Sequence, residues 1–388
     1  MRRARRAFAL ALLVALACHR GAPPLRVGTS GDYAPFSKDG QGFDVDVARQ
    51  FADSLGRPLE LVPFRWPELG ERMVRGDFDL VMSGITWRPD RDVHGWLSLA
   101  VGQGGPCWIG AAQPASVGVN KGGALEAFAQ LRFPKAKIVA VDDNASLPGL
   151  LAAHSVEAIV TDSFEIAHFR RPGDTSLCVA GSYRKVYWVA PARAADLAPA
   201  LDRFLREREP ELAKLRARWF GADQPRDATV HLLDLMARRL ELMDPVGAWK
   251  RAHQQPIEDP EQEARVLDRV AARAGELGLD PASVRALFEV EIRLAKRIES
   301  EPELGPPSLD LDSQLRPAIA RLSDRQLELL AAAAPVTAAT LTPASLAPLQ
   351  AILQPREAAE LEYALMGVSR AKSAVAPSPK QEDNPKRE

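Results

Sequence analysis

The pattern of apolar residues divides the chain near residue 222. Before this point, short apolar runs alternate with segments in which apolar residues recur every three or four positions. The runs predict strands and the segments predict helices, and their alternation indicates βαβ units with a parallel sheet. The predicted strands are 25–28, 59–63, 78–82, 116–119, 137–141 and 158–161, and the predicted helices are 43–55, 66–74, 124–130, 147–153 and 195–219.

Two such groups of half length, followed by a returning helix, predict a two-lobed α/β clamshell over residues 25–222. Ligands of parallel sheets gather at the carboxyl ends of the strands, so the loops 28–36 and 83–91 are expected to border a ligand site. Gly122 and Gly123 precede a predicted helix, where their N–H groups either bind an anion or belong to a simple turn.

After residue 222 the alternation stops and only helical spacing remains, which predicts an all-α domain over residues 228–367. Prolines after Asp280 and Thr342 mark helix starts, and Pro245 is expected to kink the first helix. Residues 371–388 are polar and charged, and we expect a disordered tail. The predicted helices are 231–251, 260–277, 281–300, 309–334 and 343–367.

Candidate anion-binding residues lie at the start of this helical half. Arg239 and Lys250 are eleven residues apart, about three helical turns, so both are expected on one face, and Gln262 follows twelve residues later. Apolar side chains fill the spaces between them. The stretch is either a buried anion site or an amphipathic surface helix with solvated cations, and spacing alone favours the surface helix.

Composition excludes several classes of function. The chain has 388 residues, of which 46% are hydrophobic, enough for two or three domains with buried cores. Its net charge of −1 gives no indication of a nucleic-acid partner. The three cysteines form no metal-binding motif, so we expect neither a metal nor another cofactor.

Residues 1–17 have the pattern of a signal peptide, with four arginines before the apolar run 8–17. Cleavage there leaves Cys18 first, so release and a lipid anchor at Cys18 are both compatible with the sequence. The mature chain is then expected in the periplasm or elsewhere outside the cytoplasm. In that oxidising compartment, Cys107 and Cys178 either form a disulfide or remain separate thiols.

The α/β half carries motifs of known proteins. With GDYAPF at 31–36, GFDVDVA at 42–48, RWPEL at 65–69, FDLVMSGIT at 78–86 and IVTDSFE at 159–165, it resembles the family 3 extracellular solute-binding proteins. More narrowly, it is similar to the periplasmic cyclohexadienyl dehydratases, which convert prephenate to phenylpyruvate and arogenate to phenylalanine. The resemblance implies a type 2 periplasmic-binding-protein clamshell.

The resemblance also implies site residues. Arg91 would grip a substrate carboxylate with its planar fork, and Glu165 would protonate the leaving hydroxyl from a closed cleft that raises its pKa. Without the resemblance, Arg91 is interpreted as a surface cation and Glu165 as a solvated helix residue. The other residues implied to contact substrate are Tyr33, Trp66, Ser83, Asn120, Gly122, Gly123 and Asp162, of which Trp66 is alternatively a core anchor.

Three positions depart from the dehydratase pattern. The loop 99–105 is short and lacks a tyrosine, Ala124 and Leu125 replace a threonine and an asparagine, and Arg184 replaces an acidic residue before Lys185. Each change is expected to remove a contact to substrate. A clamshell that binds an amino acid or small carboxylate without chemistry is therefore the rival interpretation.

The helical half resembles the secreted gamma-class chorismate mutases over residues 228–367. The motifs are RLELM at 239–243, PIED at 256–259, GLDP at 278–281 and RPAI at 316–319. The resemblance implies that Arg239 and Arg316 bind carboxylates, whereas Lys250 and a protonated Glu299 flank the ether oxygen of chorismate.

Two positions of the mutase site are changed. Gln262 occupies the place of a third cation, and Ala295 occupies that of a helix hydroxyl, whereas Arg265 lies one turn later and is a candidate replacement for the cation. Glu299 and Arg316 are alternatively solvated surface residues. A mutase half that has lost its reaction is the corresponding alternative.

The product of the mutase, prephenate, is the substrate expected for the clamshell. The sequence therefore predicts an exported bifunctional enzyme of phenylalanine biosynthesis, acting on chorismate, prephenate or arogenate. Its partners are these small molecules, and a homodimer is compatible with the sequence. The alternative is a solute-binding protein with a weakened or inactive mutase domain.

Overall fold

The computed structural model describes residues 22–179, 181, 183–221, 226–302, 307–333 and 335–371. The expected signal peptide, Cys18 and nearly all of the expected tail lie outside these residues. Within the part described, no helix is long and apolar enough to cross a membrane.

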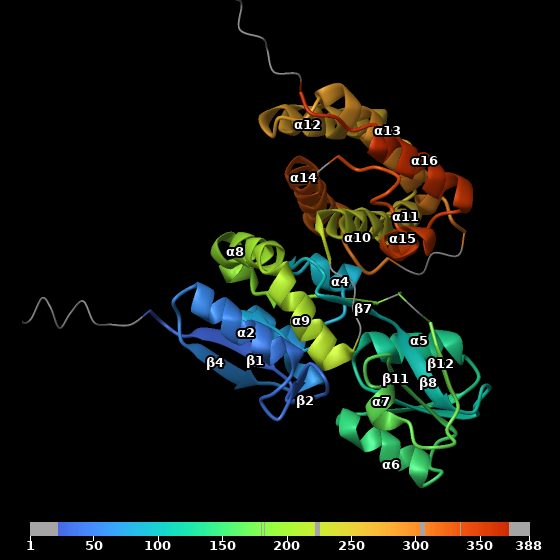
Figure 1. Ribbon diagram of the computed structural model, residues 1–388. Coiled ribbons are helices and arrows are strands. Elements are labelled where there is room, and N and C mark those ends of the chain that lie inside the picture. Colours follow the sequence, from blue (N-terminus) through green and yellow to red (C-terminus); the bar gives the residue numbers. More distant parts are fainter. Residues whose placement is uncertain are drawn as a thin grey trace, which may run out of the picture.

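The first half is the expected two-lobed α/β clamshell (Figure 1). Lobe 1 is built on a sheet in which β1 pairs in parallel with β4 and β5, while β14 runs antiparallel to β5 and β6. The order is β4(Leu59–Pro63), β1(Leu25–Thr29), β5(Leu80–Val81), β14(Trp188–Val189) and β6(Trp96–Leu97). The small hairpin of β2(Asp32–Tyr33) and β3(Ser37–Lys38) lies beside it.

The helices of lobe 1 bury apolar faces on this sheet. In α2(Phe43–Ser54), Phe43, Val47 and Phe51 recur every four residues and are fully buried, as an amphipathic helix requires. The predicted helix 195–219 is instead two helices divided at Arg208, because Pro210 lacks an N–H for the helical ladder. The other helices are η1(Trp66–Glu68), α3(Leu69–Arg75), α4(Pro89–Asp92), η3(Pro191–Arg193), α8(Ala194–Glu207) and α9(Glu209–Phe220).

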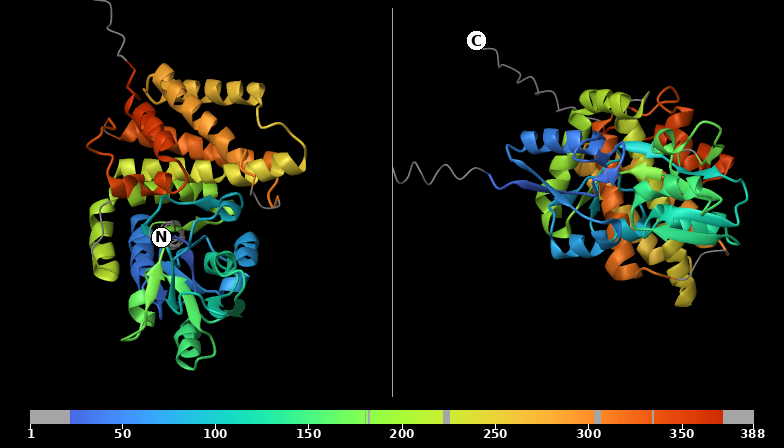
Figure 2. Two further views of the ribbon diagram at one scale, coloured as in Figure 1. Left: turned by 90° about the vertical axis from the view of Figure 1, so that its right-hand side faces the viewer. Right: turned by 90° about the horizontal axis from the view of Figure 1, so that it is seen from below.

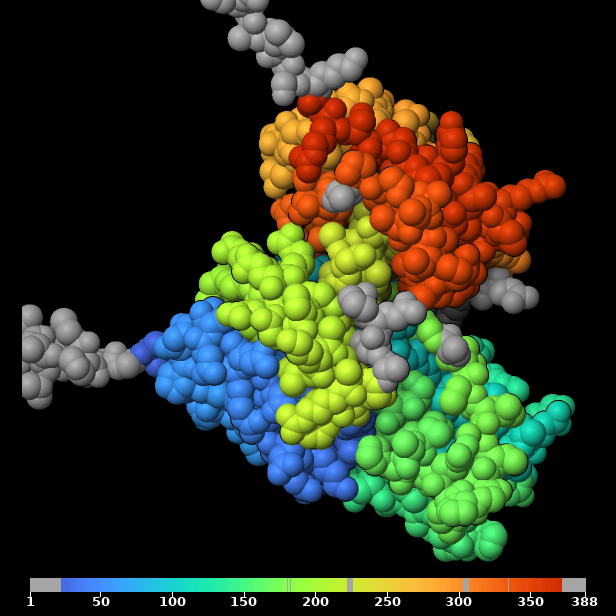
Figure 3. All heavy atoms as spheres, viewed as in Figure 1, coloured from blue at the N-terminus to red at the C-terminus, as the bar shows by residue number. Residues whose placement is uncertain are grey.

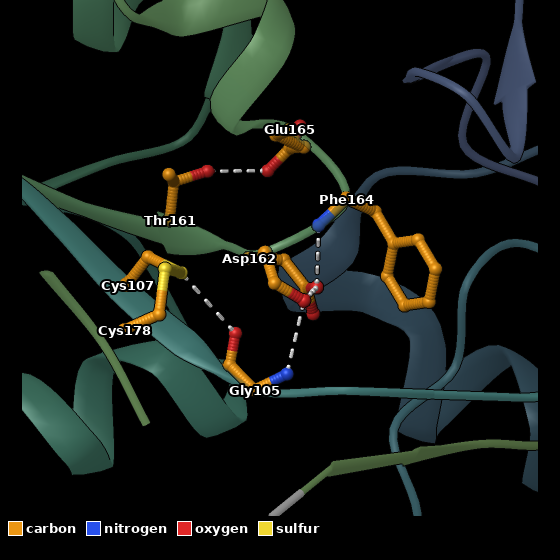
Figure 4. The surroundings of a disulfide bond; sticks show 8 residues. Gly105, Cys107, Thr161, Asp162, Phe164, Glu165 and Cys178 are labelled. Atoms are coloured by element: carbon orange, nitrogen blue, oxygen red, sulfur yellow. Dashed lines mark hydrogen bonds between the residues drawn. A yellow bond between two sulfur atoms is a disulfide. The ribbon is translucent and has the colours of Figure 1, made fainter. Parts of the chain in front are cut away.

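Lobe 2 has a second five-stranded sheet, with helices packed on it. Its strands follow the order β10(Lys137–Val141), β9(Ser116–Asn120), β11(Ala158–Asp162), β8(Pro106–Gly110) and β12(Ser176–Cys178). Its helices are α5(Ala124–Arg132), η2(Asn144–Ser146), α6(Leu147–Ala152) and α7(Ile166–Phe169). Cys107 and Cys178 face each other on paired strands and form a disulfide, which decides between the two alternatives left by the sequence (Figure 4).

Two short strands connect the lobes. β7(Gly102–Gly104) leads into lobe 2, and β13(Tyr183–Lys185) leads back and pairs with it. A Cβ atom on Gly104 would lie 2.6 Å from the Phe164 ring and 2.8 Å from Ser163 Oγ. The loop 99–105 is therefore a tightly packed part of the hinge, and only glycine fits there.

The second half is all-helical and stacks on lobe 1, with α10 along the junction (Figures 1 and 2). Pro245 divides the predicted first helix at Leu242, since its nitrogen cannot donate to the Glu241 carbonyl. The predicted helix 343–367 is likewise divided before Pro355. The helices are α10(Ala228–Glu241), α11(Met243–Ala252), α12(Pro260–Glu276), α13(Pro281–Glu299), η4(Leu311–Leu315), α14(Arg316–Ala332), α15(Pro343–Gln350) and α16(Pro355–Met366).

Side-chain caps fix several of these helix starts. Asp280 accepts a hydrogen bond from the Ser283 N–H, and Thr342 accepts one from the Ser345 N–H. Proline follows each cap, as the sequence predicts.

Figure 3 shows the surface of the helical half, in orange and red, continuing into lobe 1, with lobe 2 in green to one side.

Candidate active sites

A cleft between the two lobes gathers most of the residues expected in the clamshell site. Glu165 is almost fully buried there, at 1% exposure. It follows β11, and its carboxyl group accepts hydrogen bonds from Asn144 Nδ2 at 2.5 Å and Thr161 Oγ1 at 2.6 Å. The cleft is lined by Tyr33, Trp66, Thr86, Arg91, Asn120, Gly123, Ala124, Leu125, Asn144, Asp162, Glu165 and Lys185.

The pKa of Glu165 is raised to about 8, first because burial removes water from the carboxylate and also because Asp162 is near. Thr161, Lys185 and Asn144 lower the pKa by smaller amounts. Figure 4 shows Thr161 reaching toward Glu165 while Asp162, the next residue of β11, points to the other side of the strand. At neutral pH, Glu165 is therefore mostly protonated and can donate a proton.

Lys185, on the hinge strand β13, contacts residues of both lobes. Its Nζ lies 2.7 Å from Asp162 Oδ2 in lobe 2, and it donates to Tyr33 OH at 2.9 Å and Thr86 Oγ1 at 3.0 Å in lobe 1. Lys185 and Asp162 are both almost fully buried. This ion pair links the hinge strand β13 to lobe 2 and places both charged groups at the cleft.

Arg91 lies in lobe 1's short helix α4 and is 8% exposed, so it is not a surface cation. Its Nη1 donates to the Thr86 carbonyl at 2.7 Å. Burial, together with Arg88, lowers the pKa of Arg91 to about 10. Among the ion pairs between described residues none involves Arg91, so its charge is available to an anionic ligand.

A second cavity opens in the helical half, with an empty volume of about 1170 Å³, part of it open to solvent. Five α-helices supply one predicted site residue each. Arg239 comes from α10, Lys250 from α11, Gln262 from α12, Glu299 from α13 and Arg316 from α14. Arg239 and Lys250 therefore meet at the cavity from two helices, whereas the sequence predicted one shared face of a single helix.

Arg239 is fixed by buried neighbours. Its Nη1 lies 2.7 Å from Glu291 Oε2, its Nε donates to Ser323 Oγ at 3.2 Å, and its guanidinium lies over the Phe288 ring at 5.4 Å. Gln326 donates to the second oxygen of Glu291 at 3.1 Å. These contacts hold the guanidinium of Arg239 in one orientation.

Lys250 and Glu299 form the centre of this cavity. Lys250 Nζ lies 2.7 Å from Glu299 Oε2 and donates to the Ile257 carbonyl at 2.8 Å. The pKa of Glu299 is raised, because burial outweighs the lowering effect of Lys250. Arg316 lies at the rim, 37% exposed, where it pairs with Asp312 and lies 3.6 Å from Asp259.

Comparisons with known proteins agree with this division. The model of the bacterial extracellular solute-binding proteins, family 3, matches residues 25–222, which is half of the chain. The chain belongs to this family. The model of chorismate mutase type II matches residues 227–300, so this solute-binding protein also carries a chorismate mutase domain.

Individual relatives match one half or the other. The cyclohexadienyl dehydratase of Pseudomonas aeruginosa is 34% identical over 160 residues, 36% of this chain and 60% of that protein. The secreted chorismate mutase of Yersinia pestis is 35% identical over 105 residues, 25% of this chain and 56% of that protein. The 4-amino-4-deoxychorismate mutase of Streptomyces pristinaespiralis is 37% identical over 90 residues, 23% of this chain and 65% of that protein. The chain thus spans less than two thirds of the length of each of these three relatives.

Two residues expected in the solute-binding cleft do not line it. Ser83 is fully buried in lobe 1, where its hydroxyl lies 2.9 Å from Ser30 Oγ and 2.7 Å from Ser37 Oγ. Gly122 donates its N–H to Glu126 Oε2 at 2.6 Å, so a carboxylate of the protein itself occupies that group. Gly123 alone of the pair lines the cleft.

Three cleft residues, Thr86, Asn144 and Lys185, were missed as site residues. Thr86 and Asn144 each follow a predicted strand, and that position is the signal that could have found them. Lys185 comes from the hinge, whose pairing the sequence did not reveal.

Arg184 has a different role from the one expected. The sequence suggested that it removes a contact to substrate, but its side chain points away from the cleft. Its guanidinium pairs with Asp234 and Glu241 of the chorismate mutase domain. The departure from the dehydratase pattern is therefore a contact between domains.

The structure also shows the surroundings of Gln262 and Ala295, the two changed positions of the mutase site. Gln262 Oε1 accepts from Arg265 Nε at 3.0 Å, yet Arg265 is 61% exposed and is not among the cavity-lining residues. Lys296, beside Ala295, does line the cavity and lies 3.2 Å from Glu263. Lys296 was missed because it lies in a charged run typical of a solvated helix face.

Proposed function

We propose that this chain is a bifunctional enzyme that converts chorismate to prephenate in the helical cavity and prephenate, or arogenate, to an aromatic product in the cleft. The observation that carries the proposal is that each cavity combines cations with a buried carboxyl group of raised pKa. In the cleft these are Arg91, Lys185 and Glu165. In the helical cavity they are Arg239, Lys250, Arg316 and Glu299.

In the mutase reaction, chorismate rearranges without a covalent enzyme intermediate. Arg239 and Arg316 would hold the two carboxylates and keep the substrate compact. Lys250 and protonated Glu299 would donate hydrogen bonds to the ether oxygen as its bond to carbon breaks. Contacts that stabilise such developing charge are worth roughly 3 kcal/mol each.

In the dehydratase reaction, the ring loses hydroxide and carbon dioxide together and becomes aromatic. Arg91 would bind a substrate carboxylate through two parallel hydrogen bonds from its guanidinium group. Glu165 would give its proton to the hydroxyl group, which leaves as water, while the electrons of the breaking carbon–carboxylate bond enter the ring. Trp66, which packs edge-on against Tyr33 at 6.0 Å, would contact the ring.

The proposal includes a location outside the cytoplasm. Support comes from the extracellular family of the first half, from the Cys107–Cys178 disulfide and from the export-signal pattern of residues 1–17. Mass spectrometry of protein purified from membranes would detect the added mass of a lipid at Cys18. An unmodified chain recovered only from the soluble periplasmic fraction would exclude the anchor.

The decisive experiment supplies the purified chain with chorismate alone. Both activities predict that chorismate disappears and phenylpyruvate accumulates without a second enzyme. Prephenate that accumulates without phenylpyruvate would leave only the mutase. If chorismate and prephenate are both unchanged while an amino acid raises the melting temperature, the clamshell is a binding protein. Parallel assays with prephenate and arogenate would identify the preferred substrate from kcat/KM.

A further inference from the structure

The hinge strand β13 presents its side chains alternately to two different sites. Tyr183 donates its hydroxyl hydrogen to the Ala124 carbonyl of lobe 2 at 3.1 Å, and Lys185 reaches Asp162 in the cleft. Side chains of a strand alternate between its two faces, so Arg184 points the opposite way. It meets α10 of the mutase domain.

Arg184 is held there by two carboxylates. Its Nε lies 2.6 Å from Asp234 Oδ1, and its Nη1 lies 2.9 Å and 2.8 Å from the two oxygens of Glu241. Arg184 is 3% exposed and Asp234 1%, so removing a partner would leave a buried charge uncompensated. The guanidinium also lies 5.7 Å from the centre of the Trp87 ring.

The helix that carries these carboxylates is itself anchored. Asp234, Arg238 and Glu241 share one face of α10, with spacings of four and three residues. Arg238 pairs with Asp234 at 2.7 Å and donates to the Ser98 carbonyl of lobe 1 at 2.8 Å. The next residue, Arg239, lines the cavity of the helical half, here called the mutase cavity. Helix α10 belongs to the mutase domain, is anchored to lobe 1, and therefore gives strand β13 of the clamshell a rigid support.

We propose that Arg184 is a positioning residue of the cleft: Asp234 and Glu241 of the mutase domain hold it, and it fixes β13 so that Lys185 stays beside Asp162. The reason is covalent adjacency, since a shift of the Arg184 backbone moves Lys185 with it. The inference rests on the proposed dehydratase function, and it makes the mutase domain a structural part of the dehydratase site.

The test uses the full chain with the double substitution Asp234→Asn and Glu241→Gln, which removes both charges and keeps the shapes. The matched control is Asp202→Asn, which weakens another buried ion pair between the domains, that of Asp202 with Arg325 at 2.7 Å. We expect the double variant to lose at least tenfold in prephenate kcat, because misplacing groups by about 1 Å costs up to about 100-fold. Mutase turnover should change less than twofold in both proteins.

A pH profile separates positioning from general damage. Lys185 lowers the pKa of Glu165, so its displacement should move the basic limb of the prephenate kcat profile to higher pH. The control should keep the wild-type profile. Equal losses in the double variant and the control, or a parallel loss of mutase turnover, would overturn the proposal.

Hydrogen exchange gives a readout that does not depend on dehydratase activity. The backbone amides of 102–104 and 183–185 should exchange faster in the double variant than in the wild type or the control. If wild-type protein does not convert prephenate, the proposed function fails, and this measurement alone decides the positioning role. Unchanged exchange in the double variant would refute it.

Discussion

Lys250 and Glu299 lie in direct contact across the mutase cavity, with Nζ 2.7 Å from Oε2. Burial raises the pKa of Glu299, so the carboxyl group stays protonated to higher pH than a solvated glutamate does. In the proposed mutase reaction, a protonated Glu299 would donate a hydrogen bond to the ether oxygen of chorismate, whereas an ionised one would repel it.

Chorismate turnover should therefore fall as pH rises through the raised pKa of Glu299. The Glu299→Gln variant donates a hydrogen bond at every pH and should keep its activity on the alkaline side. The measurement is kcat/KM for chorismate against pH in both proteins. Superimposable profiles would show that Glu299 does not carry the proton.

Glu165→Gln should reduce prephenate kcat by about 100- to 10,000-fold, the usual contribution of a positioned acid. In the wild type, activity should be lost as pH rises past about 8, where Glu165 gives up its proton. Chorismate turnover in the same sample serves as the control for folding, and it should be unchanged. Wild-type dehydratase activity in the variant would remove Glu165 from the mechanism.

Asp44 should make stability depend on pH. It is fully buried, accepts from the Gly84 N–H at 2.5 Å and Tyr187 OH at 2.9 Å, and burial raises its pKa from 3.8 to about 7. Its raised folded pKa means that its stabilising contribution is full below pH 3.8 and is lost as pH rises to about 7.

The stability of the wild type relative to Asp44→Asn should consequently decline across that window, by at most about 1.4 kcal/mol per pH unit. Denaturant unfolding of both proteins at several pH values measures the difference. A difference that is independent of pH would show that Asp44 titrates normally.

Gln262→Arg should raise mutase kcat/KM about tenfold or more, because it adds a cation to the cavity wall where a carboxylate is expected. Arg265→Ala provides the comparison, since Arg265 is exposed and does not line the cavity. Its effect should stay below twofold. A larger loss in Arg265→Ala than gain in Gln262→Arg would indicate that Arg265 already supplies the third charge.

Local signals in the sequence predicted the strands β1, β4, β5, β9, β10 and β11 and most helix starts, but not β8, β12 or the hinge strands. Capped helix starts at Asp280 and Thr342 depend on residues within one turn, and both were located correctly. Pro245 was recognised as a kink, but the extent of the interruption at Leu242 depends on how α10 and α11 pack. The clamshell and the all-helical half both followed from the spacing of apolar residues together with the family motifs.

Contacts between distant segments could not be predicted in the same way. Lys185 enters the cleft only because β13 pairs with β7, and Arg184 meets Asp234 only because the helical half docks on lobe 1. Ser83 was assigned to the site by motif, yet its hydroxyl contacts Ser30 and Ser37. For such residues the nearest partner lies many positions away, and the sequence gives no distance between them.

Cys107 and Cys178 are 71 positions apart in the sequence, and the disulfide between them closes the chain of lobe 2 into a covalent ring. A protease that cuts once inside this ring cannot release a fragment until the disulfide is reduced. The nicked protein should therefore migrate as one species without reductant and as two with it. An exported protein exposed to proteases would in this way keep both lobes, and the helical half attached to them, in one molecule after such a cut.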